Sequence, residues 1–434
     1  MNLTRRTFIK RGALALVTVG SVPLWGPSFL RQLVFAAEPT RAVGGKKILI
    51  CLFQRGAVDG LSMVVPYGDK DYYAVRTEIA IAEPTRKAAG EGVLDLDGFF
   101  GFHPNMSPLL PIYQSGHLAV IQACGSPSAT RSHFDAQDFM ECGVVDDKSV
   151  HSGWLNRMLL ACPEDRAKVS PFRAVSMTGV LPRSLQGDQE ALVIPDLQTF
   201  GVSATGGFAA TPKGLDATSG FEGMYESAVD SVLHGTGEEA FDAIAMLKAA
   251  NPTKYSPQNG AKYPGGVFGR SLMQVAQMIK SNLGVEVAFV EIGGWDTHAN
   301  QGGANGQLAN RFREFSSGLA ALYRDLGDRM ADVVILTMSE FGRTVRQNGN
   351  RGTDHGHATC FMVLGGPVRG GKVYGKWPGL GRERLYEGRD LALTTDYRDV
   401  FAELAQKHLG ARDLGRIFPS FKSDARRYID LVRV

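Results

Sequence analysis

The stretch KKILICLFQRGAVDG, residues 46–60, is the clearest indication of the fold class of this chain. Residues 48–53 are all apolar and lack the polar alternation of a strand with one face in water, so we expect a strand buried on both faces. The glycines of residues 55–60 predict a turn directly after it. Strands buried on both faces are typical of parallel sheets that carry helices on either side.

Four further runs have the same continuous apolar character. They are HLAVIQAC (117–124), VEVAFVEI (285–292), DVVILTMS (332–339) and TCFMVLGG (359–366). A helical pattern begins near Ala129, and apolar side chains recur at helical spacing from Leu308 to Leu326. Buried strands that alternate with helices predict an α/β fold, a three-layer α/β/α sandwich around a mostly parallel sheet.

The predicted domain runs from residue 45 to residue 434, a length sufficient for one large core. Within it, residues 200–265 are rich in Gly, Ala and Ser and contain short helical pieces such as residues 238–249. We interpret this stretch as a cap-like insertion on the same domain.

The first 37 residues have the layout of an export signal: a basic region, an apolar stretch and a small-residue cleavage site. The sequence TRRTFIK, residues 4–10, closely matches the twin-arginine signature of bacterial Tat export. The apolar stretch is too short and too interrupted for a membrane span, although an uncleaved anchor is the alternative. We expect cleavage after Ala36 or Ala37, the Tat translocase as a partner, and a periplasmic or extracellular location.

Charge and cysteine usage exclude several classes of protein. Without the five basic residues of the signal, the formal net charge changes from +3 to −2, and no basic stripe remains to bind nucleic acid. No second apolar stretch is long enough for a permanent membrane span. The five cysteines are odd in number, widely spaced and without a CxxC pair, which indicates neither a disulfide framework nor a zinc knuckle.

Side chains with metal-binding or catalytic chemistry lie at one end of each predicted strand, where parallel sheets collect their ligands. In chain order these are Asp59, then His133 and Asp135, then Asp296 and His298, then Glu340, and finally Asp354, His355 and His357 just before the fifth strand. One sheet edge would therefore gather several carboxylates and up to four imidazoles.

Carboxylate oxygens mixed with imidazole nitrogens suit Zn²⁺, Mn²⁺ or Fe, with Ca²⁺ as a further alternative. The predicted ligands for one or two divalent ions are Asp59, Asp296, His298, Glu340, Asp354, His355 and His357. His355 and His357 would point to opposite faces of an extended segment, whereas a turn at Gly356 would bring both inward. The alternative for each residue is an ordinary cap or turn.

The segment GSPSATRSHFD, residues 125–135, leads from a strand into a helix N-terminus, where a hydroxyl is well placed to act as a nucleophile. Thr130 and Ser132 are the candidates, and the equal alternative is that one of them is a helix cap. Arg131 and Arg343 would clamp an oxyanion or form ordinary ion pairs.

Several motifs together resemble a bacterial family known as domain of unknown function 1501. They are RGAVDGL (55–61), TRSHFDAQ (130–137), GGWDTHANQ (293–301), SEFGRT (339–344), GTDHGHA (352–358), VRGGKVYG (368–375) and TTDYRDVFAEL (394–404). The resemblance covers nearly all of the chain after the signal. It implies an alkaline-phosphatase-like fold, as in sulfatases, and a site for phosphoryl or sulfuryl transfer with two metal ions.

Within this resemblance Asp59 corresponds to the ligand after the first strand, and His355 is favoured over His357 because Asp354-His355-Gly356 resembles the superfamily's Asp-His pair. One residue separates Asp296 from His298, where the superfamily has three. The chain is therefore expected to be a metal-dependent hydrolase of small anionic phosphate or sulfate esters. The alternative is a noncatalytic binding or assembly protein of the cell envelope.

Overall fold

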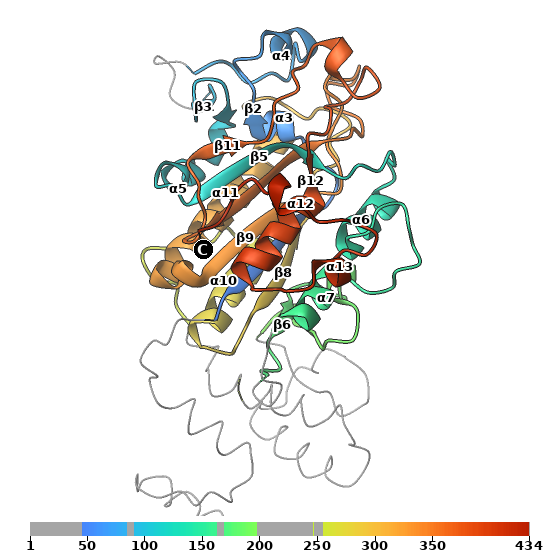
Figure 1. The fold of residues 1–434 in the computed structure, drawn as a ribbon. Coiled ribbons are helices and arrows are strands. Elements are labelled where there is room, and N and C mark those ends of the chain that lie inside the picture. The colour runs from blue at the N-terminus through green and yellow to red at the C-terminus, as the bar shows by residue number, and fades with distance from the viewer. Residues whose placement is uncertain (1–45, 85–90, 163–168, 198–245, 247–254, 434) are drawn as a thin grey trace, which may run out of the picture. The chain divides into compact units, whose positions relative to one another are not determined.

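The computed structural model describes residues 46–84, 91–162, 169–197, 246 and 255–433. These residues form a fold that is built around a nine-stranded sheet (Figure 1). The order is β11-β5-β10-β9-β1-β8-β6-β7, with β12 also paired to β5. The strands are β1 (Ile48–Gln54), β5 (Leu118–Gly125), β6 (Ala174–Ser176), β7 (Leu192–Val193), β8 (Val287–Ile292), β9 (Val333–Met338), β10 (Thr359–Gly365), β11 (Lys372–Tyr374) and β12 (Thr395–Asp396). The predicted signal peptide and most of the predicted insertion lie outside the described residues.

β1 lies near the middle of the sheet and pairs in parallel with β8 and β9. Among the described strands of this sheet, β10 alone runs antiparallel to its neighbours β9 and β5. The prediction of an α/β fold with a mostly parallel sheet is confirmed. The five predicted strands correspond to β1, β5, β8, β9 and β10, whereas β6, β7, β11 and β12 are too short to give a sequence pattern.

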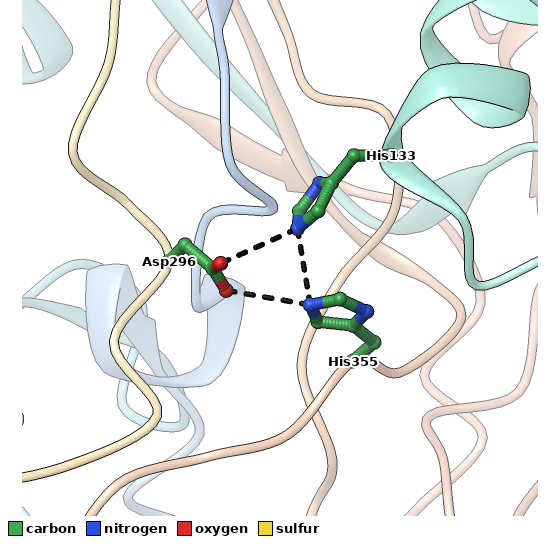
Figure 2. A group of neighbouring side chains, drawn as sticks. All are labelled: His133, Asp296 and His355. Carbon is green, nitrogen blue, oxygen red and sulfur yellow. Dashed lines mark hydrogen bonds and ion pairs between the residues drawn. The ribbon is translucent and has the colours of Figure 1, made fainter.

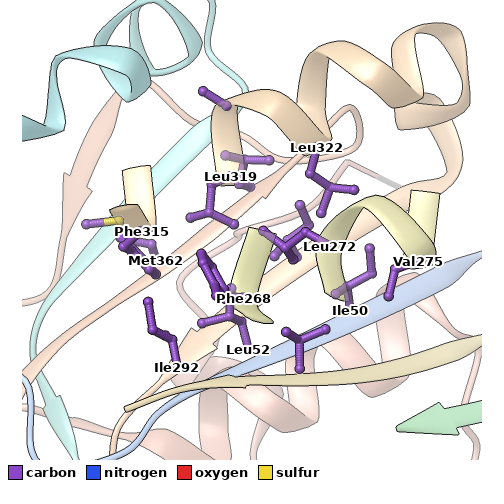
Figure 3. Close-up of a cluster of buried hydrophobic side chains, with 14 of the residues drawn as sticks. Ile50, Leu52, Phe268, Leu272, Val275, Ile292, Phe315, Leu319, Leu322 and Met362 are labelled. Carbon is purple, nitrogen blue, oxygen red and sulfur yellow. The ribbon is translucent and has the colours of Figure 1, made fainter. Parts of the chain in front are cut away.

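Helices cover both faces of the sheet. Consecutive residues of β1 point to opposite sides, so each side of the strand packs against a different set of helices. Ile48, Ile50 and Leu52 pack in one buried cluster with α10 (Val267–Lys280) and α11 (Gln307–Leu326). Leu49, Cys51 and Phe53 pack in a second cluster with α7 (Trp154–Ala161), α12 (Tyr397–Glu403) and α13 (Leu414–Ile417). Figure 3 shows the first cluster, where the aliphatic side chains of α10 and α11 meet those of the sheet.

The remaining elements are short and lie mainly in the connections. They are α3 (Gly60–Met63), α4 (Lys70–Val75), α5 (Leu110–Gln114), α6 (His133–Cys142), the 3₁₀ helices η1 (Pro104–Leu109), η3 (Arg183–Leu185), η5 (Gly327–Asp332), η6 (Arg382–Arg384) and η8 (Ala425–Arg427), and the π-helical turn η7 (Leu404–His408). A separate small sheet consists of β2 (Val64–Val65), β4 (Gly101–Phe102) and β3 (Leu94–Asp95).

The direction of β10 determines where the site forms. Its first residue, Thr359, lies opposite Cys124 at the end of β5, so β10 begins at the edge where the parallel strands end. Residues 339–358 therefore connect β9 to β10 without leaving this edge. The loops that follow β1, β5 and β8 emerge there too, which brings chemistry from four parts of the chain together.

Two further predictions concern the chain as a whole. No disulfide joins any of the five cysteines, and Cys51 and Cys360 are buried as expected. Within the described ranges, no helix has both the length and the apolar surface that crossing a bilayer requires.

Candidate metal centre

Three imidazoles and one carboxylate converge at the carboxyl edge of the sheet. His133 is the first residue of α6, Asp296 and His298 follow β8, and His355 precedes β10. The Nε2 atom of His355 lies 3.0 Å from Nε2 of His133 and 3.0 Å from Nε2 of His298. Figure 2 shows His133, His355 and Asp296 directed toward one point between them. We call these four residues the cage.

The carboxylate of Asp296 completes the cage. Its Oδ1 lies 2.9 Å from Nε2 of His298 and 3.3 Å from Nε2 of His355. Its Oδ2 lies 3.6 Å from Nε2 of His133. The side chains of Asp296 and His298 are both 45% exposed, so the cage is open to solvent and to a ligand from outside.

The other ring nitrogen of each histidine faces an oxygen that can only accept a hydrogen bond. Nδ1 of His133 lies 2.7 Å from Oε1 of Glu340, and Nδ1 of His298 lies 3.0 Å from Oδ1 of Asp354. Nδ1 of His355 lies 2.8 Å from the carbonyl oxygen of Arg131. Each Nδ1 therefore carries the proton, and in the neutral ring each Nε2 presents a lone pair to the cage.

Lone pairs that converge in this way fit a divalent metal ion. Two ligand atoms about 2.0–2.1 Å from a tetrahedral zinc would lie about 3.3 Å from each other, and the contacts within the cage are 2.9–3.6 Å. His133, Asp296 and His355 offer donor atoms that all lie within 4.8 Å of one another. Carboxylates or carbonyls behind metal-binding imidazoles are the usual support of such ligands.

Glu340 lies behind the cage and does not point into it. Its side chain is fully buried, and its Oε1 accepts hydrogen bonds from the amide of Gly56 (2.8 Å) and the side chain of Gln137 (2.9 Å) as well as from His133. Burial alone would raise the pKa of Glu340, but these hydrogen bonds hold that pKa below its ordinary value. The hydrogen bond to Glu340 in turn raises the pKa of His133. We therefore assign Glu340 to orientation of His133.

Arg343 fixes the orientation of Asp296. Its buried guanidinium donates to Oδ1 of Asp296 and to the backbone carbonyls of residues 56, 57, 295 and 353. Burial alone would raise the pKa of Asp296, and Arg343 instead holds that pKa below its ordinary value. Since all these acceptors belong to the protein, Arg343 joins three loops and is not free to clamp an oxyanion.

Asp59 lies outside the cage. Arg76 contacts both of its carboxylate oxygens, at 2.6 and 3.0 Å, and both side chains are almost completely buried. Burial would raise the pKa of Asp59, but the Arg76 guanidinium holds that pKa below the ordinary value. Asp59 reaches the cage loops only indirectly, through Gln301, whose side-chain amide donates to Oδ2 at 2.6 Å.

The two histidines of residues 355–357 have different surroundings. His355 enters the cage, whereas the ring of His357 stacks on Tyr386 at 4.1 Å with 13° between the planes. Gly356 approaches the backbone of Arg343 so closely that a Cβ there would lie 2.4 Å from a carbonyl carbon. Arg343 and His355 also form an antiparallel bridge, which holds residues 354–356 extended beside the 342–344 segment.

The predicted catalytic residues mostly have structural partners. Ser132 is the N-cap of α6 and accepts a hydrogen bond from the amide of Asp135, and Thr130 accepts one from the amide of Ser132. The guanidinium of Arg131 pairs with Asp390 and Glu387. Arg131 contributes to the cage through its backbone carbonyl instead. Ser132 directly precedes the cage residue His133 in the sequence.

His133 is the cage residue that was absent from the predicted ligand set. The sequence places it after the second strand together with Asp135, but the serines and threonine around it are also typical of an ordinary helix start. The available signal was its place at the same sheet edge as Asp296 and His355. The structure brings together Asp296, His298 and His355 from the predicted set, with Glu340 and Asp354 as supports.

Comparison with known protein families gives a match. The profile of a family described as "Protein of unknown function (DUF1501)" matches residues 46–418, which include the whole cage. A search of curated proteins finds no match.

Proposed function

The chain belongs to the DUF1501 family, and on this premise we propose that it is an exported metal-dependent hydrolase of phosphate or sulfate esters. The observation that carries the proposal is the set of three imidazoles whose Nε2 atoms converge on Asp296 while each Nδ1 donates to an oxygen. The resemblance to the alkaline-phosphatase-like superfamily supports the ester class.

The charge of the site favours a divalent cation. Asp296, Glu340 and Asp354 carry three negative charges around the cage, and Arg343 offsets one of them. A Zn²⁺, Mn²⁺ or Fe²⁺ ion would neutralise the remaining two, and the imidazole-rich donor set suits these ions better than Ca²⁺.

The residues of the chain have distinct roles in this proposal. A bound divalent ion supplies Lewis acidity toward an ester oxygen and lowers the pKa of water. His133, His298, His355 and Asp296 hold the ion, and Glu340, Asp354 and Arg343 hold those ligands in place. Ser132 directly precedes the cage ligand His133 and is partly exposed, and Thr130 lies two residues before Ser132. They are the candidates to attack an ester.

A noncatalytic binding protein is the second candidate. The observation in its favour is that Arg131 and Arg343, the two predicted oxyanion clamps, are both committed to protein acceptors. Such a protein would keep the metal but lack the groups that stabilise a transition state.

The test begins with elemental analysis of the chain purified without chelators. The hydrolase predicts a bound transition metal and metal-dependent cleavage of 4-nitrophenyl phosphate or sulfate, lost in the Asp296→Ala protein. The Asp328→Ala protein, which changes an aspartate outside the cage, is the control. Bound metal without cleavage of any ester in a broad panel would favour the binding protein.

We also propose export through the Tat pathway, based on Arg5 and Arg6. Replacing both with Lys should retain the protein in the cytoplasm, as cell fractionation would show. Normal export of this variant would exclude the Tat pathway.

A further inference from the structure

We infer that the cage holds a single divalent cation, and that the guanidinium of Arg76, instead of a second metal ion, neutralises Asp59. This inference rests on the proposed metal binding and specifies its stoichiometry. It departs from the two-ion site that the superfamily resemblance implies for Asp59.

The Asp59 carboxylate accepts four hydrogen bonds from side chains of the protein. Oδ1 accepts from Arg76 at 3.0 Å. Oδ2 accepts from Arg76 at 2.6 Å, from Gln301 at 2.6 Å and from Ser62 at 2.8 Å. Asp59 is only 1% exposed, so neither water nor an ion reaches it from solvent. A metal ion at Asp59 would have to displace several of these hydrogen bonds.

Arg76 is held as firmly as its partner. Its guanidinium donates to the carbonyl oxygens of Val345 (2.9 Å) and Thr344 (3.0 Å) and to the Ser62 hydroxyl (2.9 Å), in addition to Asp59. The side chain has no exposed surface. A divalent ion placed against Asp59 would meet this fixed positive charge within a few ångströms in a poorly solvated environment, where like charges repel strongly.

The other carboxylates offer no second cage. Oε1 of the fully buried Glu340 accepts from His133, Gln137 and the amide of Gly56, and its Oε2 accepts from the hydroxyl of Ser339. Oδ1 of Asp354 accepts from His298 and Asn348 on the outer side of the cage. In the described part of the chain, the group of such side chains close enough to share an ion, His133, Asp296 and His355, lies within the cage.

The Asp59–Arg76 pair supports the cage from behind. Gln301, which donates to Asp59, accepts hydrogen bonds from the hydroxyls of Thr297 (2.9 Å) and Thr353 (2.7 Å). Thr297 lies between Asp296 and His298, and Thr353 precedes Asp354. The pair therefore anchors the two loops that carry these residues without touching the ion.

The test measures stoichiometry in the purified mature protein. Titration of the metal-free protein with Mn²⁺, followed calorimetrically and by electron paramagnetic resonance, should show one tight ion per chain with the spectrum of an isolated ion. Two tight ions, or an exchange-coupled spectrum, would overturn the inference while leaving a metal-dependent hydrolase intact. No tight ion would overturn both. One ion without ester cleavage would remove the hydrolase but support this inference.

The isosteric variant Asp59→Asn locates the ion. If Asp59 is not a ligand, the variant should keep one ion with an affinity within about tenfold of the original, since it changes only the support of the loops. Loss of the ion would overturn the inference, and the His355→Ala protein serves as the reference for a lost ligand. Should Asp59→Asn fail to fold, the stoichiometry and spectrum of the unaltered protein decide.

Discussion

At His355 the proton on one ring nitrogen determines what the other can bind. The carbonyl oxygen of Arg131 accepts from Nδ1, so Nε2 faces the cage as a lone pair. His357, two residues later, lies on the ring of Tyr386 instead. Two histidines of one motif, separated by a single glycine, thus have separate roles, and substitution can distinguish them.

We expect His355→Ala to lose metal binding and His357→Ala to retain it, because only His355 presents a ring nitrogen to the cage. Metal content after purification and circular dichroism of both folded proteins would check this. Because the ring of His357 is buried and stacked on Tyr386, the second variant should instead be less stable. Equal metal loss in both variants would contradict the assignment.

Glu340 offers a second test at the residue scale. Glu340→Gln keeps the size of the side chain but removes the charge that fixes the Nδ1 proton of His133. Loss of a support of this kind typically weakens metal affinity roughly 10- to 100-fold. Competition titration against a chelator would measure the change, and the exposed Glu383→Gln protein is the matched control. Unchanged affinity in Glu340→Gln would mean that His133 does not bind the ion.

At the scale of elements, the site depends on the contact between residues 342–344 and residues 354–356. The segments are linked by the amide of Gly356, which donates to the carbonyl of Gly342, and by the bridge between Arg343 and His355. This contact places Asp354 and His355, from the connection between β9 and β10, beside Asp296, from the loop after β8.

Gly356→Ala should disrupt this contact, because the added Cβ would lie 2.4 Å from a backbone atom of Arg343 and 2.8 Å from the amide of Thr344. We expect weaker metal binding and a lower melting temperature. Gly349→Ala, in the same connection, is the control because its Cβ would meet no atom within 4 Å. Thermal unfolding and metal titration of both proteins would check the prediction, and similar results for the two would show that the close approach is unimportant.

The sequence predicted long elements well and missed short ones for physical reasons. The continuous apolar run of residues 48–53 gives a clear signal, because a strand buried on both faces needs apolar side chains on both. The three residues of β6 are too few to show a period. The same limit applies to Asp59. Its position after β1 was predicted correctly, but the sequence could not show that Arg76 would reach it within the fold.

At the scale of the whole molecule, the antiparallel direction of β10 is what completes the site. Periodicity predicted that strand but not its direction, which depends on pairing with β5 and β9. The resemblance to DUF1501 is confirmed over residues 46–418, and that family description assigns no function. The evidence for chemistry therefore lies in individual atoms of the cage, such as Nε2 of His133, which lies 3.0 Å from Nε2 of His355.

The stability of the whole domain should also depend on two buried histidines that do not belong to the cage. His103 donates to the carbonyl of Gly303, and His408 donates to the carbonyl of Ile48 at the start of β1. Burial lowers the pKa of each to about 4. In the unfolded chain the pKa of a histidine is about 6.5.

Because the folded pKa of each is depressed, these histidines contribute stability that is complete above about pH 6.5 and is lost as pH falls toward 4. At pH 5 the free energy of unfolding should drop by about 2 kcal/mol per histidine relative to pH 7.5. Urea unfolding at both pH values would measure the drop, which should be smaller in His408→Gln and unchanged in His151→Gln, whose imidazole is exposed. An undiminished drop in His408→Gln would mean that other groups, such as the low-pKa carboxylates Asp296 and Glu340, account for the acid sensitivity.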